Sequence, residues 1–416
     1  MKVDLIIHNC NLIATMASGG RPKRGKEMND AGIVTNGAIA IKNGKIRYIG
    51  KSDEIMNGVT SNSYVDAYGG IVTPGFVDPH THPVFVHTRE KEFAMRLAGA
   101  TYVEISKAGG GINSTIETTK NADFELLLKL AKQRIRRMIS MGTTTLEAKS
   151  GYGLDTESEL NQLSVIGALQ FSLPIDIVPT FMGAHEYPME YKNDHAAYIK
   201  ILTEEMIPAV VEQGIAKYCD IFTEAHVFNI EESRHVLLFA KAYGLKLKMH
   251  ADEIEPMGGA ELAAELRCTS ADHLGAASEK GLIAMRNANV AAVLLPATLF
   301  SLGAKSYAKG RFMIDSGLIV ALATDYNPGS CNCDSMPMVM TLACLKMGFT
   351  PIEALAASTI NAAYSIGMAD HKGSLEVGKD ADLIIWDIPS LDFIPYHFGS
   401  SHIFKVFAKG ELVHRA

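Results

Sequence analysis

The chain has 416 residues, which is enough for two or three ordinary domains or for one large barrel with a smaller appendage. Hydrophobic residues make up 47% and charged residues 20%, a balance that argues against a wholly disordered or fibrous protein. The formal net charge is -7, so we expect no basic surface for a nucleic acid.

We expect no secretion signal in the N-terminal residues, because Asp4 and His8 interrupt any apolar stretch. The longest uncharged run, residues 287–304, contains two Asn and a Pro and predicts a buried strand with its loop, not a membrane span. Six cysteines in so long a chain form no dense disulfide framework, so we expect a cytoplasmic protein. Cys331 and Cys333 form a C-x-C pair without a second pair nearby, and we favour an ordinary loop over a metal site.

Both ends of the chain contain short strand-like runs separated by hairpin turns. Asn43 and Gly44 occupy one turn, and Lys409 and Gly410 occupy another. We therefore expect the two ends to pair into one small β-sandwich domain, made of residues 1–74 and 371–416.

Residues 75–370 alternate between strand-like and helix-like segments. Asp123 can cap a helix whose apolar residues recur at intervals of three and four up to Gly142. Thr350, with Glu353 three residues later, forms the capping box of another helix. The alternation predicts parallel strands connected by helices.

Functional side chains follow eight candidate strands. These strand ends are His82, Glu147, His185, His226, His250, His273, Pro296 and Asp325. Eight such units predict a (β/α)8 TIM-type barrel, in which catalytic residues lie at the carboxyl ends of the strands. The long interval between the first two strand ends requires an insertion after the first strand.

His80 and His82 follow an apolar strand, and the alternation of side chains along a strand points both imidazoles to one side. Two neutral imidazoles at this spacing can chelate one divalent metal ion, with Asp78 as a possible supporting partner. His250, His273 and Asp325 also end strand-like segments, and a set of His and Asp donors suits Zn or Fe(II). The alternative is a group of buried, hydrogen-bonded imidazoles without a metal, which would leave much desolvation uncompensated.

On these residues the chain resembles the amidohydrolase superfamily. The general features are GFVDPHTH, the strand-end His250, His273 and Asp325, and GSLEVGKDADLIIWD. A narrower resemblance, to one branch of that superfamily, rests on His87-Thr88-Arg89, AGGGI, TLEAKSGYGL, TFMGAHEYP, HADE and ATDYNPGS. These motifs span nearly the whole chain.

The resemblance implies hydrolysis of the cyclic amide of 4-imidazolone-5-propanoate to N-formimidoyl-L-glutamate, in histidine degradation. It implies the metal ligands His80, His82, His250 and Asp325. It also implies contacts to substrate or product from Arg89, Tyr152, His185, Glu253, Asn327, Gly329 and Ser330. Binuclear relatives carry a carboxylated Lys on the fourth strand, and DIFTEAHVF has none, so one metal ion, Zn or Fe, is expected.

The same residue types suggest roles of their own. A bound metal lowers the pKa of its water toward neutrality, and Asp325 and His273 are suited to orient that water. Glu253, three residues after a ligand, can protonate the ring nitrogen, and Arg89 offers a bidentate fork to a propanoate tail. We leave His226 unassigned between a core and a supporting role, and we interpret residues 109–111 as a mobile lid or a turn.

Two other functions remain open at this stage. The same ligand pattern describes nucleobase aminohydrolases such as guanine or cytosine deaminases, although a base without a carboxylate has little use for Arg89. A catalytically silent barrel that acts in assembly is the second alternative, against which the complete ligand set argues. We also expect a small-molecule substrate, a homodimer, and no nucleic-acid or membrane partner.

Overall fold

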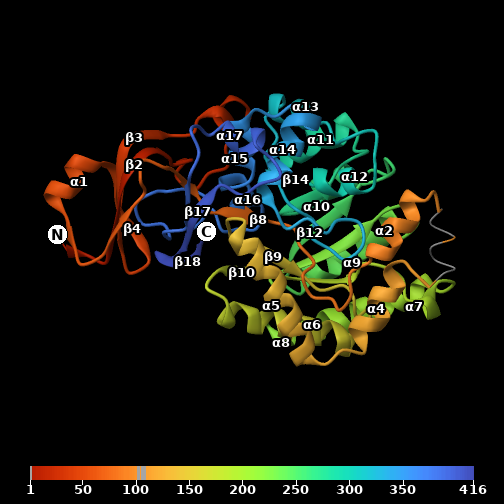
Figure 1. The fold of residues 1–416 in the computed structure, drawn as a ribbon. Coiled ribbons are helices and arrows are strands. Elements are labelled where there is room, and N and C mark those ends of the chain that lie inside the picture. Colours follow the sequence, from red (N-terminus) through yellow and green to blue (C-terminus); the bar gives the residue numbers. More distant parts are fainter. Residues whose placement is uncertain (1, 101–103, 105–108) are drawn as a thin grey trace.

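The computed structural model describes residues 2–100, 104 and 109–416. Figure 1 shows two parts side by side, a barrel and a smaller β domain in which the red N-terminal and blue C-terminal strands meet. Among the described residues, no helix is both long enough and apolar enough to cross a membrane.

Within the described residues the barrel contains eight parallel strands that neighbour one another in chain order. They are β8 (Phe76–Asp78), β9 (Thr143–Lys149), β10 (Asp176–Ala184), β11 (Tyr218–Thr223), β12 (Lys246–Ala251), β13 (Ser270–His273), β14 (Ala291–Leu294) and β15 (Val320–Leu322). The extensions of β8 and β15 close the ring through a parallel bridge between Thr81 and Tyr326. The predicted (β/α)8 TIM-type barrel is confirmed.

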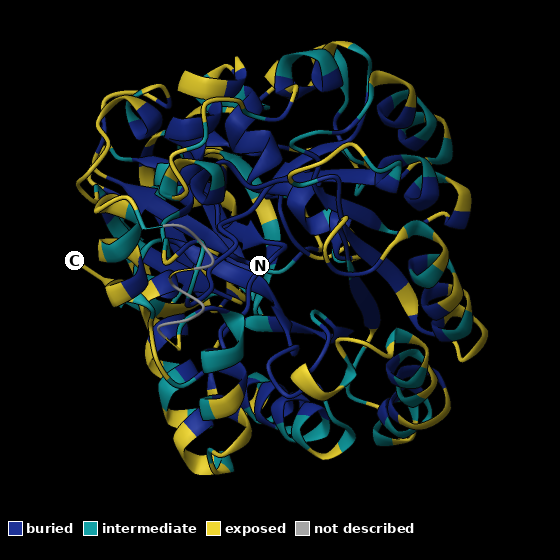
Figure 2. Cartoon of the chain, turned by 90° about the vertical axis from the view of Figure 1, so that its right-hand side faces the viewer, coloured by how far each residue is buried: buried dark blue, intermediate teal, exposed yellow. Residues whose placement is uncertain are grey.

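Helices surround these strands, with buried faces inward and exposed faces outward (Figure 2). In chain order the longer ones are α5 (Phe124–Ser140), α6 (Thr156–Ser172), α8 (Ile207–Gln213), α9 (Ile230–Ala242), α10 (Gly259–Leu266), α11 (Glu279–Ala288), α14 (Met336–Met347) and α15 (Pro351–Ala357). The predicted caps are confirmed, since Asp123 accepts a hydrogen bond from the amide of Leu126 and Thr350 forms a capping box with Glu353. The expected insertion after the first strand contains α2 (Glu90–Leu97) and α4 (Ile112–Lys120).

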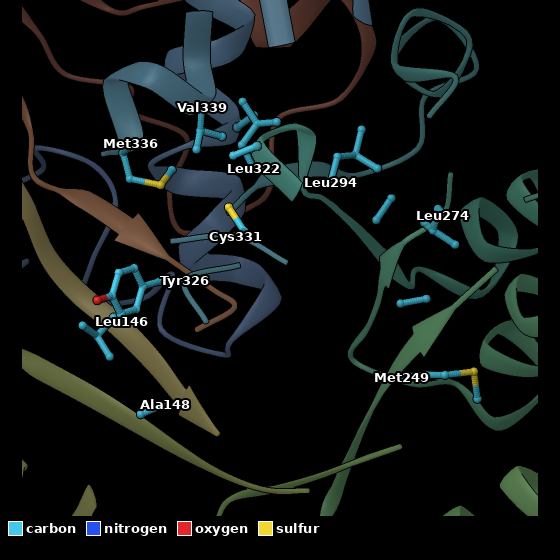
Figure 3. Packing of buried hydrophobic residues seen from close by; sticks show 14 of the residues in the cluster. Leu146, Ala148, Met249, Leu274, Leu294, Leu322, Tyr326, Cys331, Met336 and Val339 are labelled. Carbon is cyan, nitrogen blue, oxygen red and sulfur yellow. The ribbon is translucent and has the colours of Figure 1, made fainter. Parts of the chain in front are cut away.

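Side chains on each strand alternate between two faces. One face packs against the surrounding helices, and the other faces the interior of the barrel. On β9, Leu146 and Ala148 pack outward in the cluster that also contains Met249, Leu294 and Val339 (Figure 3). Because neighbouring side chains on a strand point to opposite faces, the residues between these apolar positions project into the barrel.

The interior of the barrel is layered. Its amino-terminal end is filled by an apolar cluster that includes Val77, Val178, Tyr218, Val293 and Ala321, together with α16 (Ile360–Ser365). Charged side chains lie above this cluster, and the imidazoles lie above them at the carboxyl end. Such packed layers are typical of this barrel, whose chemistry sits at the carboxyl-terminal face.

The β domain is confirmed as a β-sandwich formed by both chain ends. Its main sheet runs in the order β18 (Glu411–Arg415), β17 (Ile403–Ala408), β16 (Leu383–Trp386), β7 (Ile71–Pro74), β2 (Leu5–Ala14), β3 (Ile33–Lys42) and β4 (Lys45–Lys51), with β6 (Tyr64–Asp66) beside β2. The sheet folds over a core that includes Ile7, Ile39 and Ile385, and the amide of Ala381 donates to the carbonyl of Gly44 across it. A small second sheet pairs β1 (Lys2–Val3) with β5 (Thr60–Ser61), beside α1 (Ser52–Gly58).

A buried ammonium connects the β domain to the barrel. Lys372, with a side chain only 1% exposed, lies 2.6 Å from Asp176 of β10, 2.8 Å from Asp382 and 3.0 Å from Asp380. Removing the cation would leave the buried Asp382 without its ion-pair partner and Asp176 and Asp380 with only the more exposed Lys409 and Lys45, which is costlier than losing an exposed pair.

We therefore expect Lys372→Met to lower the free energy of unfolding by about 3–5 kcal/mol, measured by urea denaturation. Lys409→Met is the matched control, because Lys409 also reaches Asp176, at 3.0 Å, but its side chain is 47% exposed. The control should change stability by less than about 1 kcal/mol. Equal losses in the two variants would contradict this account of the junction.

Candidate metal centre and active site

Five predicted residues meet at the carboxyl end of the barrel. His80 and His82 follow β8, His250 lies on β12, His273 ends β13, and Asp325 follows β15. Their side chains are almost fully buried. His273 and Asp325 have φ angles of 75° and 54°, a left-handed conformation that is rare for residues other than glycine and is typical of functional sites.

The geometry at His80 and His82 fits a bound cation. Their Nε2 atoms lie 3.3 Å apart, and the Oδ1 atom of Asp325 lies 3.5 Å and 3.8 Å from them respectively. Two nitrogens bound to one tetrahedral metal at ~2.0–2.1 Å lie about 3.3 Å apart. Potential ligand atoms of His250 and His273 also lie within 4.8 Å of His80. The donor set therefore suits one divalent metal ion, and His273 is close enough to join or to flank it.

Buried carboxylates fix the orientation of two of these imidazoles. His80 Nδ1 lies 2.6 Å from Asp272 Oδ2, and His250 Nδ1 lies 3.2 Å from Asp220 Oδ1. When a carboxylate accepts the Nδ1 proton, the Nε2 lone pair is left for a metal. In the sequence, Asp78 is the expected partner for this supporting role. The structure instead directs Asp78 to the backbone amide and the hydroxyl of Thr324.

The carboxylates that hold the imidazoles are themselves held by two buried lysines. Lys149 Nζ lies 2.6 Å from Asp220 and 2.7 Å from Glu147, and Lys248 Nζ lies 2.8 Å from Glu147 and 3.5 Å from Asp272. We call these five residues the charged layer. Burial alone would raise the pKa of Asp220, but the charge of Lys149 and the interaction with His250, which includes a hydrogen bond, outweigh it and lower that pKa well below its usual range. Sequence analysis placed Glu147 at a strand end and did not assign the lysines.

The rim imidazoles are neutral at neutral pH. Burial lowers the pKa of His250 to about 4, although Asp220 opposes that shift, and burial also lowers the pKa of His185 to about 4. Burial, followed by the charge of Lys149, lowers the pKa of His80 well below its usual value. Neutral imidazoles have the free lone pairs that metal coordination requires.

A cavity of about 660 Å³ opens above the rim. All seven residues predicted to contact substrate or product line it: Arg89, Tyr152, His185, Glu253, Asn327, Gly329 and Ser330. The ring of His185 stacks on that of His82, at a centroid distance of 5.1 Å, and Tyr152 lies 5.3 Å from His185. The aromatic rings form a wall beside the metal ligands, against which a planar heterocycle can lie.

Asn327 and Gly329 shape the loop after β15. The side-chain amide of Asn327 donates to the carbonyl of Asp325 and to Ser330, and its oxygen accepts from the amides of Gly329 and Ser330 at 2.8 Å. A side chain at Gly329 would meet Arg89, because a Cβ built there lies within 2.3 Å of Nη1. The glycine thus allows the guanidinium to approach the loop backbone closely.

Glu253 lies on the loop after β12, and its Oε2 atom is 3.6 Å from Nδ1 of His273. Burial, followed by the negative charge of Glu224, raises the pKa of Glu253 to about 7. Glu224 accepts hydrogen bonds from the amides of Ile254 and Glu255, so it also holds this loop. A carboxyl group with a pKa near neutrality can donate a proton under physiological conditions.

Other predicted features have different positions. His226 lies in the turn after β11 and lines the cavity, and Pro296 begins α12 (Pro296–Ser301) instead of ending a strand. Residues 109–111, interpreted as a mobile lid or a turn, lead into α4 with a turn at Gly109 and with Gly111 at the N-cap of the helix, and motion as a lid stays a prediction. Cys331 is buried with its Sγ atom 3.2 Å from the carbonyl of Thr324, as in an ordinary loop.

Comparisons with known proteins agree with this arrangement. The model of the amidohydrolase family matches residues 71–413. An imidazolonepropionase from Alkaliphilus oremlandii is 48% identical over 416 residues, covering 99% of this chain and 98% of that protein. One from Symbiobacterium thermophilum is also 48% identical, over 99% of this chain and 97% of its own length.

Solved structures share the fold at low sequence identity. A zinc-bound adenosine deaminase from Xanthomonas campestris has a TM-score of 0.73 at 16% identity, covering 99% of this chain and 93% of that one. The guanine deaminase of E. coli has a TM-score of 0.73 at 15% identity, covering 99% of each chain. These structures support the assignment of the barrel and the β domain. At this sequence identity they carry no information about the substrate.

We expect Asp272→Asn to weaken metal binding about 10–100-fold, because the amide orients the imidazole of His80 less well than a carboxylate does. Competition with a chelator at constant pH measures this affinity. Asp78→Asn is the matched control, since Asp78 is also a buried carboxylate at this rim but has Thr324 as its side-chain partner. A larger loss in the control than in Asp272→Asn would return the supporting role to Asp78.

Proposed function

Since this chain belongs to the amidohydrolase family, and within it to the imidazolonepropionases, we propose that its barrel hydrolyses 4-imidazolone-5-propanoate to N-formimidoyl-L-glutamate. The protein is a hydrolase of a cyclic amide C–N bond in histidine degradation. The observation that carries the assignment is one cavity that contains both the His and Asp cluster and the guanidinium of Arg89. One end suits hydrolysis and the other suits a carboxylate tail.

We propose that His80, His82, His250 and Asp325 hold a single divalent ion, Zn or Fe. When bound, that ion lowers the pKa of a coordinated water and polarises the ring carbonyl. The charged layer supports one ion instead of two. Glu147 and Asp272 could contribute to a second site with His80, but the ammonium groups of Lys149 and Lys248 already contact both carboxylates.

Asp325 and His273 orient the attacking water in this proposal. The hydroxyl of Thr298 donates to Oδ2 of Asp325 at 2.6 Å, which leaves Oδ1 facing the imidazoles. Burial raises the pKa of Asp325 to about 6, although His273 opposes the shift. Through Oδ1 this carboxylate can accept the proton that the attacking water gives up. The Nε2 atom of His273 is buried without a hydrogen-bond partner among the described residues and can contact the substrate carbonyl oxygen.

Glu253 is the proposed acid. The water oxygen bonds to the ring carbonyl carbon, the C–N bond breaks, and the departing nitrogen takes a proton. The raised pKa of Glu253 and its position in the cavity support this role. His273, 3.6 Å away, can help to restore the proton after each turnover.

The cavity favours an imidazolone with a tail over a nucleobase. Arg89 would have no anionic partner on guanine or cytosine, whereas propanoate supplies one. A catalytically silent barrel is not favoured by the relatives' names. The homodimer and the cytoplasmic location stay predictions, the latter supported by six cysteines that form no disulfide.

We expect the purified protein to hydrolyse imidazolone propanoate, followed by ultraviolet absorbance, and to contain about one metal ion per chain. Guanine and cytosine, assayed through ammonia release, should react far more slowly. Faster release of ammonia from either base would overturn the proposal in favour of a deaminase. Two stoichiometric metal ions would overturn the single-ion assignment.

We expect Glu253→Gln to lower kcat by about 10²-fold or more while metal content stays unchanged, because the amide cannot donate the proton. An acid works in its protonated form, so wild-type kcat/KM should fall as pH rises through about 7, and the variant should lose this decrease. Glu255→Gln is the control, since Glu255 is exposed on the same loop. Normal turnover by Glu253→Gln would assign the acid elsewhere.

A further inference from the structure

One face of α2 carries three charged residues toward the cavity. Arg89, at the N-cap of the helix, and Glu92 and Arg96 are separated by three and four residues, which places them on one side of a helix. All three line the cavity. The sequence motifs identified only Arg89 among them.

Both carboxylate oxygens of Glu92 accept hydrogen bonds from neighbouring residues. Its Oε1 atom accepts from Nε of Arg89 and from the amide of Gly111, both at 2.9 Å, and its Oε2 accepts from Nη2 of Arg89 at 2.7 Å. Burial alone would raise the pKa of Glu92, but the bonds from Arg89 and Gly111 lower it overall. Glu92 is therefore ionised. This side of the helix carries one carboxylate and two guanidinium groups, so positive charge is in excess.

Within the described residues, Arg96 has an unpartnered donor atom. Its Nη2 atom is buried and has no hydrogen-bond partner in the part of the chain that the structure describes. A buried donor of a charged group is costly when unpaired, so an anion is the partner that this position favours. Arg89 and Arg96 also line a neighbouring cavity of about 540 Å³ together with Gly329, so the two guanidinium groups lie in the wall between the cavities.

We propose that Arg89 and Arg96 together form a carboxylate subsite, and that Arg96 is a second residue that selects for the propanoate tail. This inference rests on the proposed function, because it assigns the tail of that substrate. Glu92 occupies one edge of Arg89, which leaves Nη1 and one Nη2 proton of Arg89 for the ligand. Arg96 supplies the remaining positive charge, so the occupied face would carry two guanidinium groups and two carboxylates.

The subsite makes a prediction about selectivity. A neutral tail of the same length fills the same space but leaves Arg96 without an anion. The presence of the carboxylate should therefore matter more in the wild-type protein than in a variant without Arg96.

The test compares imidazolone propanoate with imidazolone propanamide in the metal-loaded protein. We expect Arg96→Met to lower kcat/KM about 10–100-fold for the propanoate, as for the loss of a hydrogen bond between charged groups, and less than about 3-fold for the propanamide. Arg96→Lys, which keeps the charge without the fork, should fall between wild type and Arg96→Met and also serves if Arg96→Met does not fold. Lys91→Met is the matched control, since it removes an exposed charge from the same helix.

Binding of imidazole-4-propanoate, which has no cyclic amide to hydrolyse, separates this inference from the proposed function. Its dissociation constant should rise about 10-fold or more in Arg96→Met, while that of 4-propylimidazole stays unchanged. If the wild-type protein binds this acid through Arg96 but hydrolyses no imidazolone, the proposed function fails and the subsite stands. If hydrolysis is normal and Arg96→Met changes both tails equally or neither, the subsite is wrong.

Discussion

The charged layer inside the barrel is the interaction on which the rest of the site depends. Asp272 and Asp220 orient the imidazoles of His80 and His250, and buried ammonium groups lie against both carboxylates. Despite burial, the pKa of Asp220 is held well below its usual range, with Lys149 as the main cause, whereas burial raises the pKa of Asp272 against the opposing charges of Lys248 and Lys149. An unpaired carboxylate there would take up a proton and would bind the Nδ1 proton of the imidazole less strongly. His80 and His250 are thus positioned by electrostatic pairs that lie below them and do not line the cavity.

Different layers of the barrel contribute to stability and to chemistry. The apolar cluster at the amino-terminal end of the barrel excludes water, so the ion pairs of the charged layer above it interact more strongly than they would in solvent. Toward the carboxyl end the backbone leaves the regular strand conformation, and His273, Asp325 and Asp252 adopt positive φ angles. At these three residues the chain leaves the strand ends, and the packed strands and helices beneath hold the strained backbone in place.

The cavity separates two kinds of chemistry. Neutral imidazoles and aspartate at one end suit a cation and a water, and arginines on α2 at the other end suit an anion. Relatives of known fold, such as adenosine and guanine deaminases, share the barrel at about one sixth sequence identity, so the barrel alone does not choose a substrate. The inserted helix α2 and its N-cap, which lie outside the regular alternation of strand and helix, carry the arginines that we propose make that choice.

Local patterns in the sequence were sufficient for several features. The hairpin turn at Gly44, the cap at Asp123 and the paired imidazoles of His80 and His82 depend on residues a few positions apart, and their geometry follows from backbone conformation alone. The strand-end His250 and Asp325 also followed from the apolar segments before them, since parallel strands of a barrel end at one rim.

Other features were decided only by the tertiary structure. Asp272 meets His80 across 192 residues, and Lys248 meets Glu147 across 101. No local pattern marks such pairs, because strand alternation tells which face a side chain occupies but not which neighbour the closed barrel brings to it. For this reason Asp78 looked like the partner of the imidazoles in the sequence, and no motif marked Arg96. The sequence alone determines which residues can do the chemistry, and closure of the barrel decides which of them touch, since a contact depends on distances that folding creates between remote segments.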